Sequence, residues 1–90
     1  MSVKINIHSG LVHLTGGHSV AEVGGSTVGR CLDQLVARFP EIKDSLFAKN
    51  GRLNGVVEIY VNSKTSYPEE LAMPVKDGDE LHIISLIIGG

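Results

Sequence analysis

One stretch of the chain has the apolar spacing of a regular helix, and this limits the folds open to its 90 residues. Thr27 is a favourable N-cap, and Pro40 predicts that the helix ends just before it. The apolar residues between them recur at helical spacing and share one stripe: Val28, Leu32, Leu35, Val36 and Phe39. An apolar stripe on one side of a helix needs a second layer to cover it.

Segments in which apolar and polar residues alternate predict that layer, because a half-buried strand has a period of two. The inward residues of three such segments are Val3, Ile5 and Ile7, then Val57, Ile59 and Val61, then Leu81, Ile83 and Ser85. Residues 11–23, interrupted by Gly16-Gly17, are predicted as the return arm of a hairpin with the first strand. Residues 63–68 predict a turn with a short edge strand.

Single turns of helix are predicted over residues 41–50 and 69–73. Together these segments predict an α+β domain in two layers. Its mixed sheet has four to five strands, with the first and last strands of the chain central and one main helix packed on one face.

Composition narrows the classes of function. The chain is 42% apolar and 20% charged with a net charge of −2, so it lacks the basic surplus that nucleic-acid phosphates attract. Its longest apolar runs fall well short of the roughly 20 residues that span a bilayer. The first residues alternate like a strand and do not form the apolar segment of a signal peptide. We therefore expect a cytoplasmic protein, monomeric when alone, that binds neither nucleic acid nor membrane.

No group of residues predicts catalysis within the chain. Cys31 lies beside the apolar stripe and is interpreted as a small core residue, not a nucleophile. The glycine-rich residues 24–29 lack the lysine and spacing of a P-loop and are interpreted as a turn and a helix cap. Four histidines lack an accompanying carboxylate cluster and are interpreted as solvated: His8, His13, His18 and His82. We expect no metal site, no bound cofactor and no enzymatic activity.

The sequence ends in Gly89-Gly90, and this pair is the most informative motif. Glycine has no Cβ, so two of them allow a terminal acyl group to pass along a narrow channel in another protein. We predict that residues 1–86 form the domain and residues 87–90 a flexible tail. The working group is then the carboxylate of Gly90, with Gly89 preceding it.

A surface for a partner protein is predicted beside this tail. Tyr60 and Ile84 point away from the helix if the strand alternation holds, and Leu86 continues the same phase. Apolar residues grouped on an open sheet face are typical of binding surfaces. The apolar Ile87 and Ile88 prolong this series, so we predict that all five contact the partner. An alternative, that loops cover these side chains or that they are scattered, stays open.

Several short motifs resemble those of the ubiquitin-like sulfur carriers. These motifs are Thr27-Val28 at the helix start, Ile59-Tyr60-Val61-Asn62 in the third strand, Leu71-Ala72 ahead of Asp77-Gly78-Asp79, and Gly89-Gly90. The family includes the small subunit of molybdopterin synthase, the thiamin sulfur carrier and the carrier of a cysteine biosynthesis pathway. The chain length and the segment Thr15-Gly16-Gly17-His18-Ser19-Val20 are most similar to the cysteine-pathway carrier.

The resemblance implies a ubiquitin-like β-grasp fold and a role as a protein co-substrate. A sulfurtransferase of the ubiquitin-activating type would use ATP to form an acyl-adenylate of Gly90. A sulfur donor would then displace AMP and leave a thiocarboxylate. The acceptor implied is a synthase, either cysteine synthase or the large subunit of molybdopterin synthase.

Two other functions stay open. In a ubiquitin-like modifier Gly90 is joined to a lysine amine, and in a plain interaction module the tail is inert. The pathway, the sulfur donor and the acceptor also stay open. The tail of this family is usually small or proline-containing before the glycines, whereas this chain has Leu86-Ile87-Ile88, so the sequence does not decide which partner accepts it.

Overall fold

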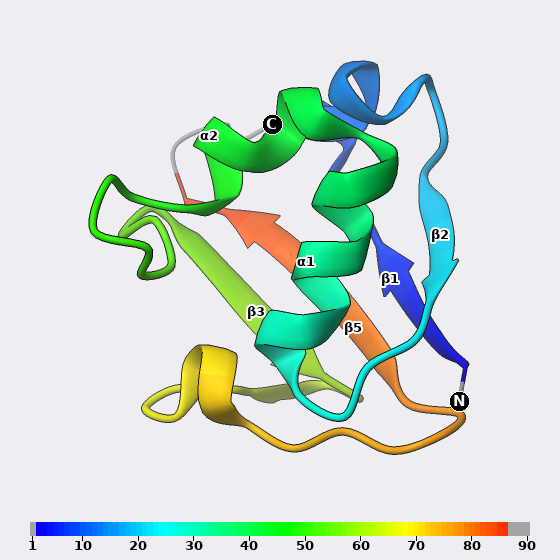
Figure 1. Ribbon diagram of the computed structural model, residues 1–90, viewed down its shortest axis with the longest axis vertical. Helices are drawn as coiled ribbons and strands as arrows, with labels where there is room; N and C mark the ends of the chain where they lie inside the picture. The colour runs from blue at the N-terminus through cyan, green and yellow to red at the C-terminus, as the bar shows by residue number, and fades with distance from the viewer. Residues whose placement is uncertain (1, 87–90) are drawn as a thin grey trace.

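A five-stranded mixed sheet lies against one long helix in the computed structural model, which describes residues 2–86 (Figure 1). The strands are β1 (Val3–Asn6), β2 (Val20–Val23), β3 (Val57–Val61), β4 (Lys64–Thr65) and β5 (Glu80–Ser85). Their order across the sheet is β2-β1-β5-β3-β4. β1 and β5 run parallel in the interior of the sheet, and the other neighbours are antiparallel. The prediction that the first and last strands lie centrally is confirmed.

The long helix is α1 (Val28–Arg38), and its ends are those predicted. At the start, the Thr27 hydroxyl accepts a hydrogen bond from the amide of Arg30 at 3.2 Å. At the end, the amide of Phe39 donates to the carbonyl of Leu35, and Pro40 follows. A capped first turn and a proline just beyond the last turn therefore fix the length of the helix.

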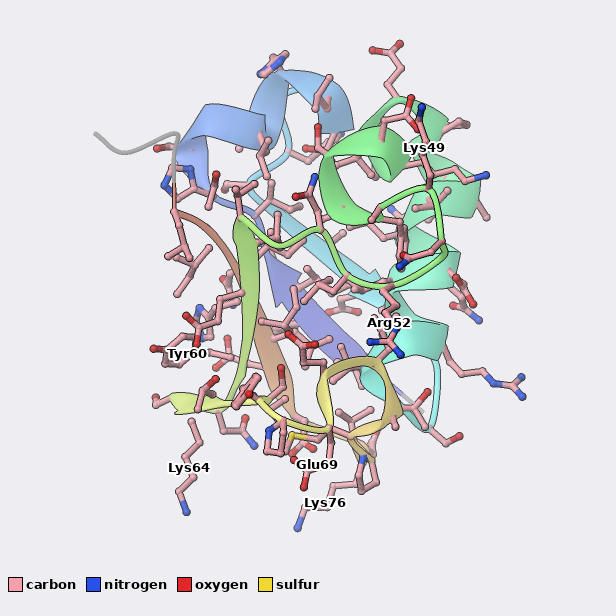
Figure 2. The ribbon with its side chains drawn as sticks, turned by 90° about the vertical axis from the view of Figure 1, so that its left-hand side faces the viewer. Lys49, Arg52, Tyr60, Lys64, Glu69 and Lys76 are labelled. Carbon is pink, nitrogen blue, oxygen red and sulfur yellow. The ribbon has the colours of Figure 1, made fainter. Side chains whose placement is uncertain are left out.

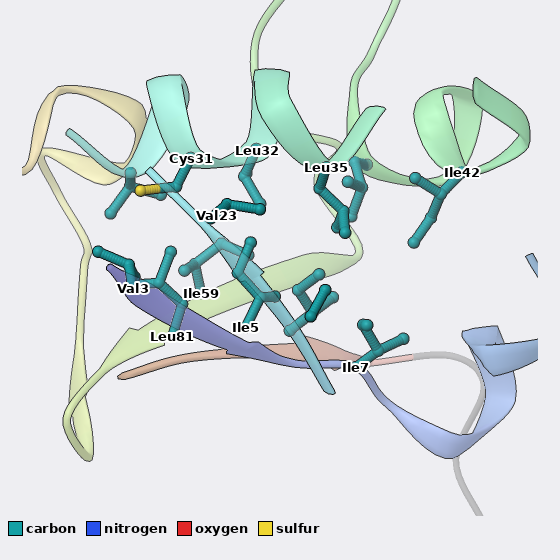
Figure 3. Packing of buried hydrophobic residues seen from close by; sticks show 14 of the residues in the cluster. Val3, Ile5, Ile7, Val23, Cys31, Leu32, Leu35, Ile42, Ile59 and Leu81 are labelled. Atoms are coloured by element: carbon teal, nitrogen blue, oxygen red, sulfur yellow. The ribbon is translucent and has the colours of Figure 1, made fainter. Parts of the chain in front are cut away.

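An aliphatic core joins α1 to the sheet, as Figure 3 shows. Its central side chains are fully buried: Leu32 and Leu35 from α1, Ile5 from β1, Ile59 from β3 and Leu81 from β5. Burying one such side chain contributes roughly 1.5–3 kcal/mol. The core therefore fixes the helix on one face and, among residues 2–86, leaves the other face of the sheet open.

The return arm of the first hairpin differs from the prediction. Residues Ser9–Thr15 form a 3₁₀ helix, η1, and only the four residues of β2 pair with β1. The Thr15 hydroxyl is fully buried and donates to the carbonyl of His18 at 2.7 Å. Gly16 then adopts a left-handed φ of 63°, which ends the turn. The prediction that the return arm begins at residue 11 was wrong, because these local hydrogen bonds replace strand pairing.

The shorter elements follow the predictions. Residues Pro40–Ile42 (η2) and Lys43–Leu46 (α2) supply the turns of helix expected over 41–50. Residues Glu70–Ala72 (η3) supply the turn expected over 69–73, and β4 is the short edge strand. The architecture is therefore the β-grasp implied by the resemblance.

The outer edge of β2 is covered by side chains of α1. The Arg38 guanidinium donates to the carbonyl of Glu22 at 2.7 Å. One helical turn earlier, the Gln34 carbonyl oxygen accepts from the amide of Gly24 at 2.8 Å. The Arg38 guanidinium also lies 5.4 Å from the centre of the Phe39 ring. Side chains thus bond the backbone groups that a strand edge exposes.

Within residues 2–86, no helix combines the length and the hydropathy that crossing a membrane requires.

Candidate partner-binding site

The uncovered face of the sheet carries the outward residues of β1, β3 and β5. Figure 2 shows Tyr60 on the side of the sheet opposite to α1. Tyr60, His82 and Ile84 are all half-buried, while their inward neighbours Ile59 and Ile83 are buried. The strand alternation therefore aims these three side chains away from the core, as predicted for Tyr60 and Ile84.

A depression of about 420 Å³ lies in this face. Its lining comes from three strands and two adjoining turns: Asn6, Ile7, His8, Tyr60, Ser63, His82, Ile83 and Ile84. Tyr60 and Ile84 therefore meet at one site, although they come from different strands. Asn6, His8, Ser63 and His82 were not predicted as site residues. Strand alternation could have added three of them, since Asn6 and His8 alternate with the inward Ile5 and Ile7, and His82 shares the outward phase of Ile84.

The register of the strands brings three lining residues side by side in the depression. His82 on β5 lies opposite Tyr60 on β3 and opposite Asn6 on β1. Ile84 lies opposite Glu58, one step further along β5. The imidazole of His82 is thus flanked by an aromatic ring and an amide, with an aliphatic side chain beside them.

The turn between β3 and β4 brings Ser63 to the rim. Asn62 and Ser63 have φ angles of 55° and 95°, so both central residues of this two-residue hairpin loop are left-handed. The amide of the Asn62 side chain donates to Asp79 at 2.9 Å, and its carbonyl oxygen accepts from the amide of Glu80 at 2.9 Å. These bonds hold the turn against the start of β5 and so position Ser63.

The opposite end of the same face is charged. Lys4 on β1 lies opposite Glu22 on β2 and opposite Glu80 on β5. Opposite charges in cross-strand positions favour this pairing, although exposed pairs contribute little to stability. The face therefore has a charged end and a more apolar end. The second contains the depression and also carries Glu58, opposite Ile84.

β5 leads out of the domain at the apolar end. The last described residue, Leu86, donates its amide to the carbonyl of Val56 at 2.7 Å. Its side chain is 62% exposed, and it lies two residues beyond Ile84, so Leu86 continues the apolar series of Ile84. The other predicted site residues, Ile87, Ile88, Gly89 and Gly90, lie outside the described residues, as does the predicted flexibility of residues 87–90.

Among residues 2–86, no three His, Cys, Asp or Glu side chains are grouped so that they could hold a metal ion. His8 and His82 line the depression, whereas His13 and His18 are exposed elsewhere. Cys31 is fully buried, and burial, with a smaller contribution from the charge of Asp79, raises the pKa of its thiol. A thiol in this state is a poor nucleophile, in agreement with its interpretation as a core residue.

The glycine-rich segment before α1 is a turn and a cap, as interpreted. A Cβ on Gly25 would lie 2.9 Å from the backbone nitrogen of Cys31, and Gly25 has a φ of 150°. The amide of Gly24 is bonded to Gln34, and the Thr27 hydroxyl caps the helix. The loop therefore serves the close packing of chain against helix.

A family model and two related proteins show which family this chain resembles. The family model described as the ThiS family matches residues 10–90 of the chain. The sulfur carrier protein CysO of Mycobacterium tuberculosis is 31% identical over 93 residues, covering 100% of both chains. Ubiquitin-related modifier 1 of Encephalitozoon cuniculi is 38% identical over 73 residues, covering 77% of this chain and 76% of the relative.

A solved structure extends this likeness to three dimensions. A chain in the crystal structure of the Amycolatopsis orientalis BexX/CysO complex matches with a TM-score of 0.88 and 32% identity. The match covers 98% of this chain and 99% of that chain. In that structure a CysO protein is therefore seen together with a second protein, BexX. The relatives carry two functional names, sulfur carrier and modifier.

Proposed function

Because the chain belongs to the ThiS family, in which its full-length relative is a sulfur carrier protein, we propose that it carries sulfur as a thiocarboxylate on Gly90. One observation supports this proposal most directly. The exposed Leu86 follows the end of β5 and lies two residues beyond Ile84, which lines the depression with Tyr60, so one partner can contact the apolar face and the residues that follow.

The proposed reaction begins with a carboxylate, which is a poor electrophile. A carboxylate oxygen of Gly90 attacks the α-phosphorus of ATP in the active site of the partner enzyme, and pyrophosphate leaves. Hydrosulfide then attacks the acyl carbon of the adenylate, the bond to the AMP oxygen breaks, and AMP leaves with its electron pair. The carrier is therefore a co-substrate, and the nucleotide belongs to the enzyme.

The length of the terminal segment suits this division of roles. Four residues follow Leu86 and span at most about 14 Å when fully extended. That span allows the acyl group of Gly90 to enter an active site while the domain stays on the enzyme surface. The two terminal glycines add no side chain to the part that would enter deepest.

The partner proposed first is a ubiquitin-activating-type adenylating enzyme, which contacts Tyr60, Ile84, Leu86, Ile87 and Ile88. The partner proposed second is a sulfur-accepting synthase that receives the thiocarboxylate. The CysO protein in the BexX complex supports the general idea that such carriers bind a second protein. We further propose that the reaction takes place in the cytoplasm, where ATP is available to the enzyme.

Intact-mass spectrometry tests the proposal. The chain is incubated with ATP, sodium sulfide and the ubiquitin-activating-type enzyme of its source organism. The expected product has one oxygen replaced by sulfur, with the change confined to the C-terminal peptide. A variant with one alanine added after Gly90 should not react, because a displacement by one residue moves the acyl carbon several ångströms. An unchanged mass for the unmodified chain would exclude the carrier function.

A modifier is the second candidate, and the likeness to ubiquitin-related modifier 1 favours it. In this case a lysine amine attacks the acyl group of Gly90, and an isopeptide bond forms. Tagged chain in extract of its source organism would then appear in conjugates of higher mass. Conjugates without any thiocarboxylate would replace the carrier by the modifier.

A further inference from the structure

The hydrogen bonding of His8 fixes which of its ring nitrogens carries a proton. His8 precedes η1 as its N-cap, and its Nδ1 accepts a hydrogen bond from the amide of Gly10 at 3.0 Å. A nitrogen that accepts this bond carries no proton. The proton of the neutral imidazole is therefore on Nε2, which makes this atom a hydrogen-bond donor.

His8 stands at the apolar end of the open face. It follows β1 by two residues and lines the depression together with Ile84, near the point where Leu86 leaves β5. Its side chain is half-buried, so the domain holds the ring without covering it. The cap bond occupies one edge of the ring and leaves Nε2 on the other edge.

The remaining lining of the depression defines what fits beside this donor. None of the lining residues carries a carboxylate, and the side-chain amide of Asn6 is engaged with the carbonyl of Leu81 at 3.3 Å and with the carboxylate of Glu80 at 3.4 Å. Tyr60 and Ile84 offer apolar surface close by. Lys4 and Glu22 lie at the far end of the face, and the carboxylate of Glu58, opposite Ile84 on β3, accepts a hydrogen bond from the Thr65 hydroxyl at 2.8 Å. An uncharged apolar side chain accompanied by an acceptor oxygen complements this set of groups.

We propose that His8 is a specificity-determining residue of the interface with the adenylating enzyme. Its Nε2–H donates a hydrogen bond to a carbonyl oxygen of that enzyme, beside an apolar side chain seated against Tyr60 and Ile84. This inference rests on the carrier function proposed above. The hydrogen bond of His8 to Gly10 orients the ring before the enzyme arrives, so little freedom is lost on binding.

Two substitutions of His8 test its Nε2–H donor and its N-cap bond to Gly10 separately. In His8→Asn the side-chain oxygen can take the place of Nδ1 and keep the bond to Gly10, but no group reaches the position of Nε2. In His8→Gln an N–H reaches that position, and the cap is lost. Calorimetric titration with the source organism's ubiquitin-activating-type enzyme should show binding weakened about threefold to tenfold by His8→Asn, the usual effect of one hydrogen bond. The His8→Gln variant should bind more nearly as the unmodified chain does.

Matched controls come from His13, which is exposed on η1 and does not line the depression. His13→Asn and His13→Gln should leave the affinity unchanged. A long-range ¹H–¹⁵N spectrum of the free protein should show the Nε2–H form of His8. Hydrogen exchange at the amide of Gly10 should be faster in His8→Gln than in His8→Asn.

The outcomes separate this inference from the carrier function. If the unmodified chain does not bind the enzyme, both are wrong. If it binds and forms the thiocarboxylate, but His8→Asn binds equally well, the carrier function stands and the role of His8 is wrong. A larger loss in His8→Gln than in His8→Asn would also overturn the donor role, because it would make the cap the important bond. A spectrum of the Nδ1–H form would do the same.

Discussion

The carboxylate of Asp79 joins three parts of the chain near the start of β5. One oxygen accepts from the side-chain amide of Asn62 at 2.9 Å, and the other accepts from the backbone amide of Lys76 at 2.9 Å. The hydrogen bond from Asn62, then that from Lys76 and the positive charge of Lys76, lower the pKa of Asp79, and partial burial opposes them. This residue therefore holds the turn that carries Ser63 to the depression.

We expect this carboxylate to make folding depend on pH in acid. Because the folded-state pKa of Asp79 is lowered, its contribution to stability is present above the unfolded pKa of about 3.9 and is lost as pH falls through the folded value. Urea unfolding between neutral pH and strong acid should therefore show a smaller acid loss in Asp79→Asn than in the unmodified chain. Asp33→Asn, a change on the exposed face of α1, is the control. Equal acid losses in the chain and Asp79→Asn would contradict the expectation.

At the scale of elements, the edges of the sheet decide whether strands of two chains can pair. Backbone groups on β2 and just after it are bonded to Arg38 and Gln34 of α1. The opposite edge, β4, has only two residues. Blocked or short edges are a common protection against pairing between chains. The helix thus protects the edge strand as well as covering the core.

The double variant Arg38→Ala with Gln34→Ala should expose the edge of β2. We expect it to associate with itself at high protein concentration, because the freed backbone groups can pair with a second β2 strand. Light scattering across a concentration series measures this association. Arg30→Ala, which removes an exposed arginine from the same helix, should stay monomeric. A double variant that stays monomeric would contradict this expectation and show that water satisfies the freed backbone groups of β2 equally well.

Elements with one clear period were predictable from the sequence. The helix stripe and the alternation around Ile59 and Ile83 arise because one face of each element is buried. The spacing of apolar residues in the sequence shows which face that is. The 3₁₀ helix η1 was not predictable in this way. It depends on hydrogen bonds of the His8 Nδ1 and the Thr15 hydroxyl, and such bonds produce no periodic pattern of apolar residues in the sequence.

The same distinction applies to the site. Tyr60 and Ile84 were predictable because each follows the outward phase of its strand. His8 continues the same alternation beyond β1, but its bond to Gly10 at the start of η1 is not visible in the pattern. Ser63 reaches the depression through a turn with two left-handed residues, and strand phase cannot be extended through such a turn because its dihedral angles redirect the chain.

At the scale of the whole molecule, the two faces of the sheet have different surroundings. α1 and the core occupy one face, and the other holds the depression beside the end of β5. The proposed docking surface can therefore change without disturbing the core. This separation makes the surface accessible to mutation.

Ile84→Asp should weaken binding to the adenylating enzyme tenfold or more, since a charge would enter an apolar contact. Thermal unfolding should change little, because Ile84 is half-buried on the open face. Calorimetric titration and a melting curve on the same sample give both values. Tyr67→Asp alters an exposed side chain that does not line the depression and should leave the affinity unchanged. Equal affinities for the two variants would remove the depression from the interface.

The central place of β5 has a mechanical consequence. β5 is hydrogen-bonded to β1 on one side and to β3 on the other, and it ends next to Leu86. A pull on the residues beyond Leu86 acts along the strand, so the bonds of both ladders are loaded in shear and share the force. In the carrier function proposed above, a partner that draws the terminal residues into its active site would pull on the strand with two bonded neighbours, and the fold would withstand repeated cycles of loading and release.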